Sequence, residues 1–256
     1  MLIVLSPAKR LDFTEADPAL PASARRFHDD TASLSRTARA RTVAELRRLM
    51  GISDDLARLN RERFQAFDPD STEGVQAAFA FAGDVYEGLK ARDLDPSGLA
   101  FAQAHIRILS GLYGLLRPLD RIQPYRLEMG TRLKTRRGAS LYDFWGDRLS
   151  KQLNADAEGQ ADPTLVNLAS QEYFGAVDAR ALKLPVVTPH FYEDKAGDRR
   201  IISFFAKRAR GTMARFAVDE RIEKAEELKR FDRDGYRFDR TASTETDWIF
   251  IRAGNS

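Results

Sequence analysis

The sequence contains no cysteine, which excludes disulfide bonds, thiolate catalysis and cysteine-ligated zinc or iron–sulfur centres. Histidine is also scarce. The three histidines are His28, His105 and His190, and none lies within four residues of another, so a local metal motif such as HExxH is absent. An all-carboxylate metal site stays open, but no spacing indicates one. We therefore predict neither a metal site nor a cofactor.

Long apolar runs are missing as well. No stretch approaches the ~20 apolar residues that a membrane-spanning helix needs. The opening segment, MLIVLSPAKR, has a short apolar run with no basic segment before it, which is unlike a secretory signal. We therefore expect a cytoplasmic protein with no membrane partner.

The charge of the chain is unevenly distributed. The formal net charge of the 256 residues is only +3. Residues 104–137 nevertheless hold eight Arg or Lys against Asp120 and Glu128, and residues 199–215 hold six with no acid. Two concentrated basic stretches indicate an anionic partner such as a phosphate backbone. The alternative is that these cations lie on solvated faces and pair with acids elsewhere.

The patterns along the chain predict one integrated α+β domain over residues 1–256. The run LIVL at residues 2–5 predicts a buried strand, and Ser53 is a candidate cap for a helix over 53–66. Further helices are expected at 22–50, 75–83, 99–109, 141–153 and 206–222, and further strands at 164–170, 185–193, 199–207 and 247–253. A strand near residue 2 needs partners, and most other expected strands lie after residue 160, so we favour one domain over two.

The motif Ser6-Pro7-Ala8-Lys9 follows the first expected strand directly. Its spacing is that of a serine nucleophile with a lysine base. The partner motifs Ser-Asp-Asn and Lys-Thr-Gly are absent, however, and so is a Gly-x-Ser-x-Gly elbow. We favour a turn at a strand end, in which free amides together with Lys9 and Arg10 contact an anion.

The segment HIRILSGLYGLLRPLDRIQPYRLEMG, residues 105–130, has the general form of a helix-hairpin-helix. In such an element, glycines let backbone N–H groups approach a phosphate without reading base sequence. Here Gly111 and Gly114 are one residue further apart than usual. The alternative is a packing loop whose arginines pair with Asp120 and Glu128.

The segment AKRARGTMARFA, residues 206–217, predicts a basic amphipathic helix. Lys207, Arg208 and Arg215 lie on or near one face, with Arg210 at its boundary. Gly211 lowers helix stability by ~1 kcal/mol relative to alanine, which indicates a close approach by a backbone or a ligand. Carboxylates at Asp84, Glu87, Asp120 and Glu172 are conceivable catalytic groups, but we favour them as caps and arginine partners.

Several motifs together resemble a known family, the YaaA family of bacterial peroxide-stress proteins. They run in order from end to end: SPAK with LD after it, FAGDVYEGL, HIRILSGLYGLLRPLD, PYRLEMG, LYDFWGD, NLASQEYF and FAKRARGTMARF. Arg10 departs from the family, which usually has threonine after the lysine. The resemblance implies a cytoplasmic protein that limits free iron under peroxide stress. It also implies a mixed α/β fold with a helix-hairpin-helix element, a positively charged cleft and DNA binding, without an established enzyme activity. The positions of this chain that match are Ser6, Lys9, Arg107, Gly111 to Gly114, Arg117, Tyr125, Arg126, Lys207, Arg210 and Gly211.

Three hypotheses of function follow. The first is a peroxide-stress protein that binds DNA largely independently of sequence. Its predicted contacts are Lys9, Arg107, Gly111, Gly114, Arg117, Tyr125, Arg126, Lys207, Arg208 and Arg210. Neutralising six phosphates would give a log–log salt slope of about −5. The second is an enzyme acting on nucleic acid or a phosphorylated small molecule, which requires Lys9, Tyr125 and Glu128 to converge. The third is a module whose basic face binds an acidic protein.

Overall fold

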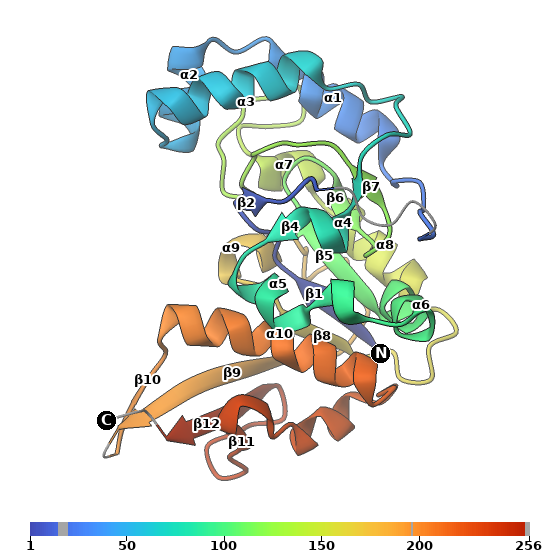
Figure 1. Cartoon of the computed structure of the whole chain (residues 1–256), viewed down its shortest axis with the longest axis vertical. Coiled ribbons are helices and arrows are strands. Elements are labelled where there is room, and N and C mark those ends of the chain that lie inside the picture. Colours follow the sequence, from blue (N-terminus) through green and yellow to red (C-terminus); the bar gives the residue numbers. More distant parts are fainter. Residues whose placement is uncertain (15–19, 196, 254–256) are drawn as a thin grey trace.

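The architecture centres on one eight-stranded sheet, seen in a computed structural model that describes residues 1–14, 20–195 and 197–253 (Figure 1). The strand order is β11-β12-β9-β8-β1-β5-β6, with β10 paired to β9. The strands are β1 (Leu2–Leu5), β5 (Ile106–Ser110), β6 (Gly114–Leu116), β8 (Leu165–Leu168), β9 (Val186–Lys195), β10 (Asp198–Arg200), β11 (Arg237–Phe238) and β12 (Asp247–Ala253). The expected α+β domain is thus a mixed fold around a mostly parallel sheet.

Strand β1 lies in the interior of this sheet. It pairs in parallel with β5 on one side and with β8 on the other, and all four of its residues are buried. A strand covered on both faces needs a continuous apolar run, which LIVL supplies. The predicted strand is confirmed.

Ten helices of the described residues surround the sheet. They are α1 (His28–Arg39), α2 (Val43–Met50), α3 (Asp54–Ala66), α4 (Ala77–Ala80), α5 (Asp84–Leu89), α6 (Pro96–His105), α7 (Leu141–Trp145), α8 (Arg148–Ala157), α9 (Gln171–Phe174) and α10 (Ser203–Asp219). Helices α1 to α3 form one end of the molecule, and β9 to β12 form the other (Figure 1). Short 3-10 turns occur at Ala91–Asp93, Ala225–Arg230 and Arg233–Gly235. None of the helices in the described part of the chain has the length and apolarity that crossing a membrane would require.

Two small antiparallel pairs lie outside the main sheet. Strand β2 (Arg10–Leu11) pairs with β4 (Phe81–Ala82), and β3 (Val75–Gln76) pairs with β7 (Arg121–Ile122). The first pair joins the SPAK segment to the chain that enters α5. It therefore fixes the segment on which the site described below depends.

Several predicted elements are confirmed close to their expected bounds. Helix α3 begins after Ser53, whose hydroxyl accepts a hydrogen bond from the backbone N–H of Leu56. Strands β8, β9 and β12 and the β9–β10 hairpin occur where expected. Residue 196, within that predicted turn, lies outside the described residues.

Other predicted helices are interrupted. The helix expected over 22–50 is two helices. Helix α1 ends at Arg39, and Thr42 caps the start of α2 with a capping box to Glu45. The helix expected over 141–153 is also two, since Gly146 has a φ of +50° at the end of α7. The helix expected over 75–83 is reduced to α4, and the strand expected over 199–207 gives way to α10 at Ser203.

The helix-hairpin-helix prediction for residues 105–126 is wrong. Helix α6 ends at His105, and the next five residues form the buried strand β5. Strand β6 then returns antiparallel to β5, so the glycine-bearing turn joins two strands. The run IRILS is buried on every residue, and such a run does not distinguish a strand from a buried helix by its period.

The backbones of α5 and α10 touch where both helices carry glycine. A Cβ atom at Gly211 would lie 1.7 Å from the carbonyl oxygen of Val85. A Cβ atom at Gly88 would lie 2.3 Å from the carbonyl oxygen of Arg208. The close approach predicted at Gly211 is therefore confirmed, and its partner is the backbone of α5.

We predict that Gly211→Ala destabilises the protein by about 2 kcal/mol or more, because the added methyl group overlaps Val85. This steric cost outweighs the ~1 kcal/mol that alanine contributes to helix propensity. Chemical denaturation measures the change in the free energy of unfolding. Lys207→Ala, an exposed substitution on the same helix, should stay within about 0.5 kcal/mol. Equal stability of Gly211→Ala and the native protein would contradict the contact.

Candidate functional site: a charged cleft at the sheet edge

The candidate site lies where β1 and β8 end. These strands are parallel, and Leu5 pairs with Leu168, so their carboxyl ends open at the same edge of the sheet. Ligands of open parallel sheets bind at this edge. The chain segments that follow are the SPAK motif on one side and Ala169-Ser170 on the other.

Ser6 ties these two segments together. Its hydroxyl accepts a hydrogen bond from the backbone N–H of Ser170 at 2.9 Å and lies 3.3 Å from the Ser170 hydroxyl. Its carbonyl oxygen accepts a hydrogen bond from the Tyr86 hydroxyl at 3.0 Å. Lys9 instead pairs with Glu128. The motif is therefore a strand-end turn, as favoured from the sequence, and Ser6 has a positioning role in it.

A cleft of about 500 Å³ opens over this turn. Its walls come from the SPAK segment, the start of α5, the segment around α9, and α10. Its charged side chains are the basic Lys9, Arg10, Lys207 and Arg210 and the acidic Asp84, Glu87 and Glu172. The lining is therefore of mixed charge. The sequence indicated all four cations. It did not indicate Ser170, whose only signal is its place after a buried strand.

Lys9 is an exposed cation of the cleft lining. Its side chain is 70% exposed, and its Nζ lies 3.7 Å from Glu128 Oε1. Glu128 is only 14% exposed, and the same oxygen accepts hydrogen bonds from Arg126 at 2.9–3.0 Å. The other oxygen, Oε2, is buried and has no hydrogen-bond partner within the described residues. Two of the three groups required by the enzyme hypothesis, Lys9 and Glu128, thus converge.

Helix α10 carries three cations that no carboxylate neutralises in the described part of the chain: Lys207, Arg208 and Arg210. Lys207 and Arg208 are exposed, and Arg210 is half-buried. Burial lowers the pKa of Arg210, with no acid to offset the effect. Lys207 and Arg210 are three residues apart and line the cleft, whereas Arg208 lines two neighbouring hollows.

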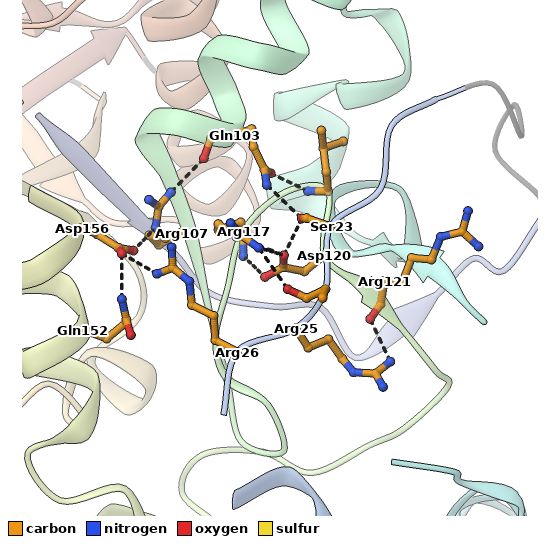
Figure 2. A network of polar contacts seen from close by, with 12 residues as sticks. Ser23, Arg25, Arg26, Gln103, Arg107, Arg117, Asp120, Arg121, Gln152 and Asp156 are labelled. Atoms are coloured by element: carbon orange, nitrogen blue, oxygen red, sulfur yellow. Dashed lines mark hydrogen bonds and ion pairs between the residues drawn. The ribbon is translucent and has the colours of Figure 1, made fainter. Parts of the chain in front are cut away.

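The polar network of Figure 2 lies elsewhere and contains three cations of the first basic stretch: Arg107, Arg117 and Arg121. Arg107 is 4% exposed and forms an ion pair with Asp156, which also pairs with Arg26 and accepts a hydrogen bond from Gln152 at 2.8 Å. Burial lowers the pKa of Arg107, and Asp156 partly offsets this shift. Arg107 therefore anchors β5 to α8 rather than facing solvent.

Arg117 lies in the adjoining part of the network. It pairs with Asp120 at 2.9 Å, and Asp120 is fully buried (Figure 2). The Ser23 hydroxyl donates to Asp120 at 2.6 Å and accepts from Gln103 at 2.9 Å, so the segment around residue 23 is held against the sheet. The pairing of Arg117 with Asp120 and of Arg126 with Glu128 confirms the alternative reading of this stretch.

The remaining predicted contacts of the 105–130 segment are also internal. Tyr125 is 5% exposed, and its hydroxyl lies 2.6 Å from the Ser110 hydroxyl. Gly111 and Gly114 are buried, and a Cβ atom on Gly114, whose φ is +73°, would lie 2.7 Å from the Trp145 ring. Both glycines thus serve packing. The site of this structure therefore gathers Lys9, Lys207 and Arg210, with Arg126 behind Glu128.

Within residues 1–14, 20–195 and 197–253, no three His, Asp or Glu side chains lie close enough together to hold a metal ion. His190 pairs with Asp247 at 2.8 Å, and His28 lies between Asp29 and Asp70. His105 donates a hydrogen bond from Nδ1 to the backbone carbonyl oxygen of Met1 at 2.9 Å. None of these histidines lines the cleft.

Comparison of the sequence with known proteins assigns the chain to a family. A family model described as peroxide stress protein YaaA matches residues 1–242. A UPF0246 protein of Caulobacter vibrioides (strain NA1000 / CB15N) is 64% identical over 252 residues, which cover 98% of this chain and 99% of the relative. UPF0246 proteins of Phenylobacterium zucineum and Ruegeria pomeroyi are 63% and 56% identical, each over 98% of this chain and over 95% and 98% of the relatives. The resemblance noted in the sequence is confirmed.

We predict that Asp156→Asn lowers stability at neutral pH by about 3 kcal/mol or more, because Arg107 stays buried without its counter-charge. Burial alone would raise the pKa of Asp156, but Arg107, Arg26 and Gln152 outweigh burial and lower it. The carboxylate therefore stabilises the fold above its unfolded pKa of about 3.9, and this contribution is lost as the pH falls through the lower folded value.

Denaturation from pH 7 to pH 2 checks this prediction. The native protein should lose stability below about pH 4, and Asp156→Asn should lack that part of the acid dependence. Asp198→Asn, which removes an exposed pair with Arg200, serves as the control and should change little at pH 7. Identical acid profiles of the native protein and Asp156→Asn would contradict the role of the network.

Proposed function

We propose that this chain, which belongs to the family of peroxide stress protein YaaA, binds DNA at the charged cleft, largely independently of base sequence. One observation carries the proposal. Three cations on α10, Lys207, Arg208 and Arg210, lack carboxylate partners within the described residues. By contrast, Asp156, Asp120 and Glu128 neutralise Arg107, Arg117 and Arg126. Unpaired, accessible cations are the groups that phosphate oxygens attract.

The contacts in this proposal are fewer than those expected from the sequence. Lys9, Lys207, Arg208 and Arg210 are retained, because each lines the cleft or a hollow beside it. The DNA-contacting role predicted for Arg107, Gly111, Gly114, Arg117 and Tyr125 is not carried forward, since these residues have internal partners or are buried. Arg126 pairs with Glu128 and is not counted among the phosphate contacts. Four phosphate contacts correspond to a log–log salt slope of about −3.6.

The cellular part of the proposal follows from family membership. The cytoplasmic location and the limitation of free iron under peroxide stress, which the resemblance implies, stay predictions. A protein that binds the DNA backbone without reading bases would suit a general protective role, because oxidative damage is not confined to one sequence.

We predict that the double variant Lys207→Gln/Arg208→Gln binds duplex DNA more weakly at every sequence tested and shows a salt slope shallower by about 2, since two phosphate contacts are lost. Fluorescence anisotropy of labelled duplexes across a salt series measures both quantities. Arg230→Gln, which alters an exposed arginine paired with Glu227 outside the cleft, should retain the native affinity and slope. Unchanged binding by the double variant would rule out α10 as the DNA contact.

An enzyme acting on nucleic acid or a phosphorylated small molecule is the second candidate function. The carboxylate of Glu128 favours this enzyme function. One of its oxygens is buried without a hydrogen-bond partner in the described residues, and the other pairs with Lys9. A carboxylate and an amine beside a cleft can exchange a proton with a bound substrate. Buried polar atoms without partners occur at catalytic sites.

For this candidate we predict product formation from DNA or nucleotides by the native protein and none by Glu128→Gln, because the amide cannot accept a proton. Mass spectrometry of the reaction mixture detects the product. Glu227→Gln, at an exposed site outside the cleft, is the matched control and should act like the native protein. Equal product from Glu128→Gln and the native protein would exclude Glu128 as the proton-transfer group.

A further inference from the structure

The lining of the cleft contains an arginine and a carboxylate that do not form an ion pair with each other. Arg210 and Asp84 are both half-buried, and both line the cleft. Neither forms a side-chain hydrogen bond or an ion pair with the described residues. Taking charges out of water is costly unless partners replace the water, so this arrangement favours a ligand that supplies an anion for one group and a donor for the other.

The size of the cleft limits the ligand. Its volume of about 500 Å³ lies within the ~300–1,000 Å³ typical of small-molecule sites. A DNA duplex, whose major groove alone is ~12 Å wide, cannot enter such a space, although its backbone can lie along the rim. The cleft therefore has room for one ligand, or one part of a ligand, of small-molecule size.

The residues that line the cleft also indicate that its ligand carries chemical groups other than a phosphate. Asp84 and Glu172 would repel a bare anion but would accept hydrogen bonds from N–H or O–H groups. Pro7 and the ring of Tyr173 supply apolar surface against which a flat ring can lie. An anionic group, hydrogen-bond donors and a flat ring occur together in a nucleotide.

We propose that the cleft holds one nucleotide unit, with its phosphate at Arg210 and Lys9, its base or sugar donors at Asp84, and its base against Tyr173. This inference deepens the proposed function and rests on it, since Lys207 and Arg208 continue the row of cations from the cleft along α10. The unit is either a free nucleotide or one extruded from a DNA strand. Extrusion of a base into a protein pocket is most favourable for an unpaired or mismatched nucleotide.

Calorimetry with the four deoxynucleoside 5′-monophosphates and with inorganic phosphate tests the site on the full chain. We expect monophosphates to bind at least about tenfold more tightly than inorganic phosphate, because only they reach Asp84 and Tyr173. Arg210→Gln and Asp84→Asn should each weaken monophosphate binding about tenfold. The matched control is Arg230→Gln, at an exposed arginine outside this cleft, and it should leave this binding unchanged.

A duplex carrying one mismatched 2-aminopurine distinguishes the two sources. A rise in 2-aminopurine fluorescence on adding protein, lost in Asp84→Asn and kept in Arg230→Gln, identifies an extruded nucleotide. Monophosphate binding without that rise identifies a free nucleotide. Absence of both signals, or equal affinity for monophosphates and inorganic phosphate, overturns the inference.

The experiments distinguish a failure of the nucleotide site from a failure of DNA binding. If duplex DNA binds and depends on Lys207 and Arg208, but no nucleotide signal occurs, only the nucleotide site is overturned. If monophosphates bind and duplex DNA does not, the nucleotide site stands as a small-molecule site and DNA binding is overturned. Because Asp84→Asn removes a charge without changing side-chain volume, it keeps the test informative even where Arg210→Gln fails to fold.

Discussion

The direct backbone contact between α5 and α10 is the constraint on which the site depends. The carbonyl oxygen of Val85 occupies the space that a side chain at position 211 would need, and Gly88 admits the backbone of α10 in the same way. Because the helices approach so closely, α10 lies near the carboxyl ends of β1 and β8 (Figure 1). Lys207 and Arg210 thereby join a cleft whose opposite wall begins with α5. Two glycines thus place a basic helix in one wall of the cleft.

The two basic stretches of the sequence have separate physical roles. In the first, Arg107 and Arg117 are surrounded by Asp156, Asp120 and neutral hydrogen-bond partners, and they hold the segment at residues 23–26 against the sheet. In the second, Lys207, Arg208 and Arg210 have no such partners in the described residues. A cluster of cations in a sequence therefore indicates a binding surface only where the fold leaves their charge uncompensated. Among the cations that line the cleft, that condition holds for Lys207 and Arg210.

The sequence predicted those elements whose signals are local. The apolar run of β1, the Ser53 cap of α3 and the hydrophobic face of α10 each contain their own evidence, and all three are confirmed. The sequence predicts a helix where β5 lies. Every residue of IRILS is buried, so the segment lacks the alternation of polar and apolar residues that would indicate a strand. The partnership of Arg107 with Asp156, 49 residues away, has no local signature at all. For the site, Lys9, Lys207 and Arg210 could be predicted from charge beside a strand end and on a helix. Ser170 and the unpaired state of Asp84 required the fold.

Photo-cross-linking tests the central claim, that nucleic acid lies over the carboxyl ends of β1 and β8, most directly. DNA carrying 5-iodouracil would be irradiated with the full chain, and the modified peptides would be identified by mass spectrometry. The account predicts cross-links within residues 6–10, 82–87, 170–173 and 203–210, which surround the cleft. Cross-links confined to residues 105–130, or to α1 to α3 at the far end of the molecule, would contradict it.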